Sequence, residues 1–444
     1  MPEGLLDRLQ GGGAAAELFE ASSDTLEVSF SAGEVKGALA RETSGLGLRA
    51  QRGGRAGFVC SRDLSPEGLA ALERNVESSL EVGDPAAFEF PAASAPEVAA
   101  EALELFDPAT AALGAGELVG VGKAALDELR AAFPGVTFDA TVRRSIGRTS
   151  LRNTAGLEVE HRYTVFSCSV EANRTRDEDV LLDWASAAST SQERADPARV
   201  VRELRRRLEW SRETVDWRPG RMPVLFTPSG GLVVWSPLLQ ALSGKTVMLG
   251  TSPLRARLGE QIVSPQVTLL DDGLRVGALG SAPSDDEGVP RRRRALIEAG
   301  ALRGFVHDLE TAAATGSEPT GNGERAGATA RPEPGFSNVV VEGGARGWEE
   351  MLAGIDYGVL VHRVVGMGQG NTLPGNFTNP FDLAFLIEGG QVKGRIKDGS
   401  IAGNVYELLG EGRLSGLSRE VEPVGGSTWL PWLQLADLNV VGKG

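Results

Sequence analysis

Apolar and polar residues alternate along several stretches of the first half of the chain, which is the pattern of half-buried strands. Leu26, Val28 and Phe30 point one way, and the polar residues between them point the other way. Because side chains on a strand alternate between two faces, each such stretch predicts one strand. Further strands are expected in this half at 45–49, 56–60, 148–153 and 157–173.

Apolar residues spaced three or four apart predict helices that bury one face. The clearest case begins at Ser65, a capping residue that precedes Pro66 at the first helical position. Leu72, Val76 and Leu80 then form a buried stripe. The other helices are expected at 5–19, at 116–133, from Asp196 onward, at 229–242 and at 348–355.

The part of the chain after residue 220 is rich in short segments of strand character, separated by glycine and proline. Strands are expected at 359–365, 381–388 and 391–396, with a hairpin turn at 388–391. The 58 glycines of the sequence favour many turns over a helical bundle. We therefore expect an α+β fold with mixed and antiparallel sheets, flanking helices and a strand-rich C-terminal domain.

The composition along the chain indicates three domains. Residues 84–99 are rich in proline, alanine and serine, as linkers are. A length of 444 residues is enough for two or three domains. The expected domains are an N-terminal α/β domain at 1–90, a central helix-strand-helix domain at 107–216 and the strand-rich domain at 220–444.

Charge and apolar runs exclude several classes of partner. The formal net charge is −15, and an acidic chain repels the phosphate backbone of nucleic acids. The basic run from Arg291 to Arg294 is interpreted as a solvated edge. No apolar run is long enough to span a membrane, and the first residues do not resemble a signal peptide. Two cysteines, Cys60 and Cys168, fit a reducing compartment, so we expect a cytoplasmic protein without nucleic-acid or membrane partners.

The common catalytic motifs are absent from the sequence. The three histidines, His161, His307 and His362, have no helically spaced histidine partner that would place two imidazoles around one metal ion. The group His307, Asp308 and Glu310 is interpreted as the start of a helix whose first-turn acidic residues lie on the surface. A hydrolase that uses these three residues together with His362 is one open alternative.

An ordered series of short motifs resembles the TldD/PmbA metallopeptidase family. The strongest is Ile-Ala-Gly-Asn at 401–404, directly before an apolar helical stretch. Each motif is short, but together they follow the order of the family over nearly the whole chain. The others are GLGLR at 45–49, GF at 57–58, DLS at 63–65, NTAG at 153–156, DDEGVP at 285–290, TA at 311–312, TGNG at 320–323, SN at 337–338, GVLV at 358–361, GNFT at 375–378, PW at 431–432 and VVG at 440–442.

The resemblance implies a protease assembly of two subunit types. A TldD-type subunit holds zinc through a His-Glu-x-x-x-His helix and a later cysteine, and a PmbA (TldE)-type subunit has the same fold without these ligands. Here the zinc helix falls at 235–240, where Trp235 and Gln240 replace the histidines and Ser236 replaces the glutamate. The late cysteine falls near Ser427 and Thr428. We therefore expect a PmbA (TldE)-type subunit without a cofactor, and zinc in a TldD-type partner.

The resemblance thus implies a non-catalytic, PmbA/TldE-like subunit of a TldD/TldE-type metalloprotease complex that acts in the proteolysis of unfolded peptides. An older label for the family is modulator of DNA gyrase. A homodimer that binds peptides without a protease role is the second alternative. The glycine-dense loops 321–327 and 366–375 allow close backbone approach, which suits the addition of a peptide strand. Contacts to a peptide or partner are expected at Gly321, Asn322, Asn338, Gly375, Asn376, Phe377 and Asn404.

Overall fold

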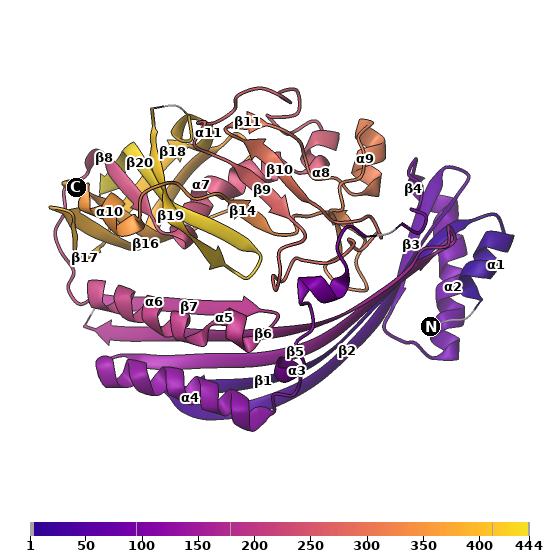
Figure 1. The fold of residues 1–444 in the computed structure, drawn as a ribbon, viewed down its shortest axis with the longest axis horizontal. Coiled ribbons are helices and arrows are strands. Elements are labelled where there is room, and N and C mark those ends of the chain that lie inside the picture. The colour runs from indigo at the N-terminus through magenta and orange to yellow at the C-terminus, as the bar shows by residue number, and fades with distance from the viewer. Residues whose placement is uncertain (1–3, 95, 178, 411, 443–444) are drawn as a thin grey trace.

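The computed structural model describes residues 4–94, 96–177, 179–410 and 412–442. Strands in this part of the chain form two large sheets, and helices pack on both (Figure 1). Most neighbouring strands are antiparallel, and two pairs in the second sheet are parallel. The expected α+β class, with a strand-rich C-terminal part, is confirmed. No helix within these ranges is both long and apolar enough to cross a membrane.

The first sheet is long and curved (Figure 1), and it contains seven antiparallel strands within the described ranges. Its order is β4-β3-β2-β1-β5-β6-β7. The segments at 1–90 and 107–216 therefore contribute to one continuous sheet, joined where β1 pairs with β5. The strands are β1 (Ala15–Ser31), β2 (Glu34–Arg52), β3 (Arg55–Ser61), β4 (Asp84–Pro85), β5 (Thr137–Asn153), β6 (Glu158–Arg176) and β7 (Asp179–Ser189).

Helices cover one face of the first sheet, and the alternation along β1 decides which face. Ala16 and Leu18 are buried in a core with α1 and α2, and Val28 and Phe30 are buried in a core with α4. The hydroxyl of Ser65 accepts a hydrogen bond from an N–H in the first turn of α2, as the sequence predicts. The helices of this half are α1 (Leu5–Gly11), α2 (Pro66–Val82), α3 (Pro108–Ala111), α4 (Ala115–Ala132), α5 (Gln192–Ala195) and α6 (Pro197–Trp210), with a 3₁₀ turn at Ala100–Leu103.

The second sheet has eleven strands within the described ranges, in the order β11-β10-β9-β14-β20-β18-β16-β15-β8, with β17 beside β16 and β19 beside β20. Because β20 pairs with both β18 and β8, the strands β20, β18, β16, β15 and β8 close into a ring. The strands are β8 (Gly220–Phe226), β9 (Leu269–Asp272), β10 (Arg293–Glu298), β11 (Ala301–Leu302), β14 (Val339–Val341), β15 (Tyr357–Val364), β16 (Asn376–Glu388), β17 (Gln391–Ile396), β18 (Gly399–Asn404), β19 (Leu414–Val424) and β20 (Thr428–Gly442). β12 (Gly323–Glu324) and β13 (Glu333–Pro334) form a separate short ladder.

Helix α7 (Pro228–Ala241) packs against this ring, and Val234, Trp235 and Leu238 on it are fully buried. Pro237 lies inside α7 without ending it. The remaining helices of this half are α8 (Gly244–Met248), α9 (Leu309–Thr315), α10 (Trp348–Ala353) and α11 (Val405–Leu408).

Helix α6 joins the two sheets, because its apolar side faces both of them. Leu204 and Leu208 share one core with Phe385 and Trp432 of the second sheet. The Arg206 guanidinium lies over the Trp432 ring at 5.5 Å from the ring centroid. The two parts of the chain therefore share apolar core through this helix.

Two local predictions are wrong. The helix expected at 5–19 ends at Gly11, and β1 begins at Ala15, because three consecutive glycines at 11–13 stop the helix and Ala16 pairs with β2. The stretch expected to be a linker at 84–99 packs against the fold: Phe88 and Phe90 in it are both 7% exposed, with ring centroids 5.6 Å apart.

We predict opposite effects for two glycines of α4. A Cβ at Gly122 would overlap the Phe30 ring of β1, whereas a Cβ at Gly120 meets no atom within 4 Å. Gly122→Ala is expected to lower the free energy of unfolding by about 1–3 kcal/mol. Gly120→Ala is expected to leave it unchanged or raise it by up to about 1 kcal/mol, because alanine favours helix. Urea denaturation followed by circular dichroism measures both, and equal effects would contradict this packing.

Candidate functional site

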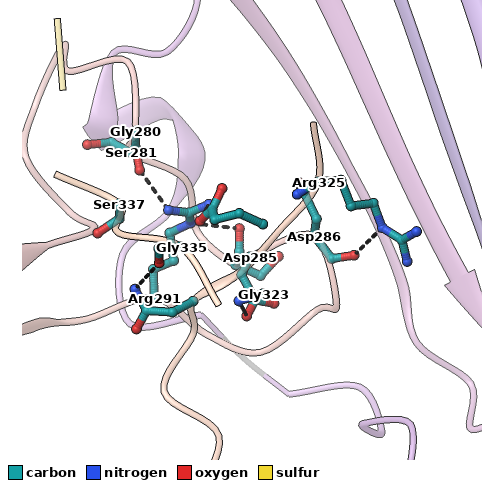
Figure 2. A network of polar contacts seen from close by, with 12 residues as sticks. Gly280, Ser281, Asp285, Asp286, Arg291, Gly323, Arg325, Gly335 and Ser337 are labelled. Carbon is teal, nitrogen blue, oxygen red and sulfur yellow. Dashed lines mark hydrogen bonds and ion pairs between the residues drawn. The ribbon is translucent and has the colours of Figure 1, made fainter. Parts of the chain in front are cut away.

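The seven expected contact residues fall in two places. Gly321, Asn322 and Asn338 lie beside a cluster of buried and half-buried carboxylates, here called the carboxylate cluster. Gly375, Asn376, Phe377 and Asn404 lie together where β16 pairs with β18. The carboxylate cluster consists of Asp271, Asp285, Asp286, Glu287 and Glu324 (Figure 2 shows part of it).

The two asparagines of the first group are fully buried and hold the backbone. The Asn322 amide donates to Asp271 at 2.7 Å and to the carbonyl of Gly335 at 2.9 Å. The Asn338 amide donates to the carbonyl of Asp272 at 2.7 Å. Since both side chains are 0% exposed, the geometry gives them a structural task. Their contact with a peptide stays a prediction.

The acidic turn at 285–290 is built around Asp285. Its carboxylate accepts hydrogen bonds from the N–H groups of Glu287, Val289 and Gly323, at 3.0, 2.9 and 2.7 Å. Figure 2 shows Asp285 beside Gly323, and Asp286 beside Arg325. A side chain at Gly323 would overlap the Glu287 carboxylate, so a glycine is required for this close approach.

Arg291 is buried in this cluster, which corrects the expectation of a solvated basic run. It is 5% exposed, pairs with Glu324 at 2.6 Å and donates to the carbonyl of Gly280 at 2.8 Å. Arg292 and Arg293 are exposed, as expected. A buried charge requires such a partner, and no local pattern distinguishes Arg291 from its neighbours in the sequence.

A buried ion-pair network connects this cluster to the first sheet. The network consists of Glu17 on β1, Arg49 on β2, and Glu287 and Arg325 in the second half of the chain. Arg49 pairs with Glu17 at 3.2 Å and with Glu287 at 2.6 Å, and Arg325 also pairs with Glu17. Arg49 and Glu287 enter the sequence analysis only as parts of the family motifs at 45–49 and 285–290, and Glu17 and Arg325 lie in ordinary polar-apolar stretches that gave no signal.

Burial controls the protonation of the carboxylate cluster. Burial raises the pKa of Glu287 to about 8, with Arg49 opposing the shift and Asp285 adding to it. Burial likewise raises the pKa of Asp285 to about 7 and the pKa of Glu324 to about 7. Arg291 opposes both shifts because its positive charge favours the ionised carboxylates.

A cavity of about 320 Å³ lies between this cluster and the first sheet. His161 and Tyr163 of β6 line one side, and Asp286, Arg325 and Gly327 line the other. The glycine-dense loop at 321–327 therefore reaches the cavity wall. Its mixed polar and apolar lining is typical of a ligand site between two structural units.

The second group of expected residues surrounds the N-terminus of α11. Asn404 caps this helix, and its amide donates to Asn376 at 3.0 Å and to the carbonyl of Pro374 at 2.8 Å. Gly375 has φ of 85°, and a side chain there would press on the Tyr406 ring. Asn376 is exposed, whereas Phe377 is buried in the core. This group is partly open to solvent, unlike the first.

The loop that precedes Gly375 contacts α7 at the position of the expected zinc helix. The Thr372 hydroxyl donates to the Gln240 amide oxygen at 2.7 Å. Trp235 is fully buried one and a half turns earlier on the same helix, and no residue that the structure describes accepts a hydrogen bond from its indole N–H. Ser236 is partly exposed.

Comparison with known proteins decides the family. A sequence model described as the PmbA/TldA metallopeptidase C-terminal domain matches residues 219–442. A second, described as PmbA/TldA metallopeptidase domain 1, matches residues 16–81. The chain belongs to the PmbA/TldD family.

Relatives within the PmbA/TldD family carry metalloprotease names. A metalloprotease from Methanocaldococcus jannaschii is 32% identical over 191 residues, which are 43% of this chain and 42% of that protein. A metalloprotease TldD homolog from Haemophilus influenzae is 30% identical over 43% of this chain and 39% of that protein. The matched region thus spans about two fifths of either relative.

Solved structures of the family resemble the whole chain. TldE from Thermococcus kodakarensis has a TM-score of 0.89 and 26% sequence identity, and 99% of each chain is covered. A Thermotoga maritima protein described as a modulator of a DNA gyrase has a TM-score of 0.86 and 23% identity, with 98% of each chain covered. The second likeness concerns the fold alone.

The residues on α7 do not fit the zinc ion that the family name implies. The indole nitrogen of Trp235 carries a hydrogen and has no free lone pair for a metal, and the Gln240 oxygen already accepts a hydrogen bond. Ser427, near the position of the late cysteine, offers only a hydroxyl. Within the described ranges, no group of three or more His, Cys, Asp or Glu side chains is placed to hold a metal ion.

The residues of the alternative hydrolase serve other contacts. The expected helix start is present, with Asp308 as the N-cap of α9. Glu310 is exposed, as expected, whereas Asp308 is only 3% exposed, which corrects its expected surface position. His307 lies at 3.3 Å from the Thr311 hydroxyl, and His362 at 2.9 Å from the Thr227 hydroxyl. Burial keeps the pKa of His362 well below its usual value. The two histidines thus have separate local partners.

We predict that raising the pH from 7 to 9 destabilises the fold. Folded Glu287, Asp285 and Glu324 hold protons that the unfolded chain has released at these pH values, so stability falls as pH rises through their raised pKa values. The expected loss is about 2 kcal/mol of unfolding free energy. The histidines do not contribute, because burial lowers the pKa of each of them.

Glu287→Gln should remove more than half of this pH dependence, measured by denaturation at constant ionic strength. Glu310→Gln is the matched control, because it makes the same chemical change at an exposed position. Stability that is constant or that rises between pH 7 and 9 would show that these carboxylates are ionised in the folded protein.

Proposed function

We propose that this chain is a PmbA (TldE)-type, non-catalytic subunit of a TldD/TldE-type metalloprotease assembly that degrades unfolded peptides. The observation that carries the proposal is the likeness to TldE over 99% of both chains, with a TM-score of 0.89. Because the likeness covers almost all of both chains, it includes both sheets and α7 rather than a single shared domain.

The chemistry at α7 supports the non-catalytic assignment. A catalytic zinc site needs three protein ligands and an open position for water. The three positions where the resemblance places ligands hold Trp235, Gln240 and a hydroxyl near Ser427. In this proposal the zinc and the general base belong to a TldD-type partner, and this chain supplies the scaffold and part of the peptide-binding surface.

Two accessible features support contact with an extended peptide. The exposed Asn376, beside Gly375, is the first residue of β16, where a bound peptide would reach this strand. The 320 Å³ cavity between the sheets, reached by the loop at 321–327, is large enough for one or two side chains. Unfolded peptides share only their backbone, so open loops and strand ends suit a substrate class without a fixed sequence.

We predict that the purified chain contains no stoichiometric zinc and does not cleave an unfolded peptide by itself. Adding a TldD-type chain from the same cell should give a complex whose peptide cleavage is lost with a chelator. Metal analysis, gel filtration of the mixture and a peptide-cleavage assay measure these outcomes.

Three results separate the alternatives. Stoichiometric zinc, or cleavage by the contaminant-free chain, would support the self-sufficient hydrolase. Peptide binding without any association with a TldD-type chain would support a binding protein without a protease role. Cleavage by the TldD-type chain that does not depend on this chain would also contradict the proposal.

A further inference from the structure

Arg206 on α6 is a partly buried cation without a counter-charge. Its guanidinium carbon lies over the rings of Trp210, Trp348 and Trp432, at 5.5, 4.9 and 5.5 Å from their centroids. Its Nε is fully buried, and no residue that the structure describes forms an ion pair or a hydrogen bond with this side chain. Burial lowers its pKa, with Glu422 opposing the shift. A charge removed from water costs free energy unless a partner compensates it.

The other arginines of the same helix each have a carboxylate partner. The pairs are Arg199 with Glu203 at 2.7 Å, Arg202 with Asp196 at 2.7 Å, Arg205 with Glu209 at 3.3 Å, and Arg207 with Asp183 at 2.8 Å. Arg206 is therefore an exception on α6, although it is less exposed than Arg202 and Arg205.

A small pocket lies beside Arg206, between α6 and the N-terminus of α7. Its volume is about 20 Å³, and a volume of about 10–15 Å³ already admits one water molecule. Arg206, Ser229 and His362 line it, from α6, α7 and β15 respectively. The pocket therefore has room for one small ion, and it is too small for a phosphate or a sulfate.

The first turn of α7 has a free N–H group at this pocket. Thr227 caps the helix by accepting a hydrogen bond from the N–H of Gly230 at 3.1 Å, and Pro228 has no N–H. The N–H of Ser229 has no acceptor among the described residues. Because α7 is fourteen residues long, the partial positive charge at its N-terminus also favours an anion.

His362 supplies a further donor from β15. Its side chain is 7% exposed, and its Nδ1 lies at 2.9 Å from the Thr227 hydroxyl. That hydroxyl accepts from Gly230, so its own hydrogen is available to Nδ1, and the hydrogen of the neutral ring is then on Nε2. Nε2 has no hydrogen-bond partner among the described residues and is not completely enclosed by protein, so it is open to the pocket.

Two carboxyl groups also line the pocket, and neither forms an ion pair with Arg206. Glu203 pairs with Arg199 at 2.7 Å, and Glu422 accepts a hydrogen bond from the Trp432 indole at 2.9 Å. Burial raises the pKa of Glu422, with Glu203 adding to the shift. An ionised Glu422 opposes an anion in the pocket, so replacing it by a neutral amide should strengthen anion binding.

We propose that this pocket binds one small inorganic anion of the size of chloride, held by the Arg206 guanidinium, the Ser229 N–H and the His362 Nε2–H. The anion supplies the counter-charge of Arg206 where α6 packs against the second sheet. A single water molecule is the alternative occupant, and it would leave this charge uncompensated. The proposal does not rest on the proposed protease role, so either can fail without the other.

The broadening of the chloride NMR line by the full chain measures binding in solution. With sodium gluconate holding the ionic strength constant, the broadening is expected to saturate with a Kd of about 1–10 mM. Bromide should compete with chloride, whereas sulfate should not, because the pocket is too small for it. Equal competition by sulfate at the same ionic strength would show charge screening instead of a site, and would overturn the proposal.

Three substitutions test the residues of the pocket. Arg206→Gln should weaken chloride binding about tenfold or more, because it removes the uncompensated charge. Arg205→Gln is the matched control, because it makes the same change at the preceding, exposed position of α6, and it should change the Kd less than about twofold. Glu422→Gln keeps an acceptor for the Trp432 indole and should strengthen binding about threefold or more.

Circular dichroism checks that each variant is folded. If Arg206→Gln does not fold, the increase in affinity expected for Glu422→Gln carries the test, because loss of structure cannot raise affinity. The proposal is overturned if the wild-type chain shows no saturable broadening, if Arg205→Gln acts like Arg206→Gln, or if Glu422→Gln weakens binding or leaves it unchanged.

Crystals of the full chain grown in sodium bromide locate the ion. An anomalous difference peak is expected between Arg206, Ser229 and His362, and it should be absent from crystals of Arg206→Gln. A water molecule in the wild-type pocket, with bromide only at exposed positions, would assign the pocket to water and overturn the proposal.

Discussion

The buried ion-pair network of Glu17, Arg49, Glu287 and Arg325 is the interaction on which the arrangement of the two halves depends. All four side chains are almost completely removed from water, and each guanidinium lies against a carboxyl group on another element. Two buried charges compensate their lost hydration only when their geometry is satisfied together. The first sheet and the acidic turn are therefore fixed relative to each other, and the cavity between them follows from that placement.

Other contacts hold the remaining carboxyl groups of the carboxylate cluster. Asp285 is held by three backbone N–H groups, and Glu324 by Arg291. Burial nevertheless raises the pKa values of these carboxylates. The carboxylate cluster thus has a structural role, because its hydrogen bonds fix the loop at 321–327. Asn322 and Asn338, which lie in family motifs, belong to the same hydrogen-bonded arrangement.

The PmbA/TldD fold keeps the helix α7 in place without metal ligands. The buried Trp235 fills core volume, and Gln240 holds the loop that leads to Gly375. Apolar packing and one amide contact therefore stabilise a position for which the family resemblance implies zinc coordination in TldD-type subunits. The position of α7 in the fold therefore rests on the packing and hydrogen bonding of the chain's own residues.

The sequence by itself determined those local features whose cause lies within a few residues, such as helix caps. Ser65, Asp196 and Asp308 cap helices because a side-chain oxygen reaches an N–H within the first turn. Ordered motifs over nearly the whole chain indicated the family before the comparison established it. Only the tertiary structure decided that two segments share one sheet, that Phe88 and Phe90 are buried, and that Arg291 is not solvated. Arg325 and Glu17 are 308 positions apart. Such partners meet only after the two sheets pack together. The pattern of apolar and polar residues around either one therefore does not indicate the contact.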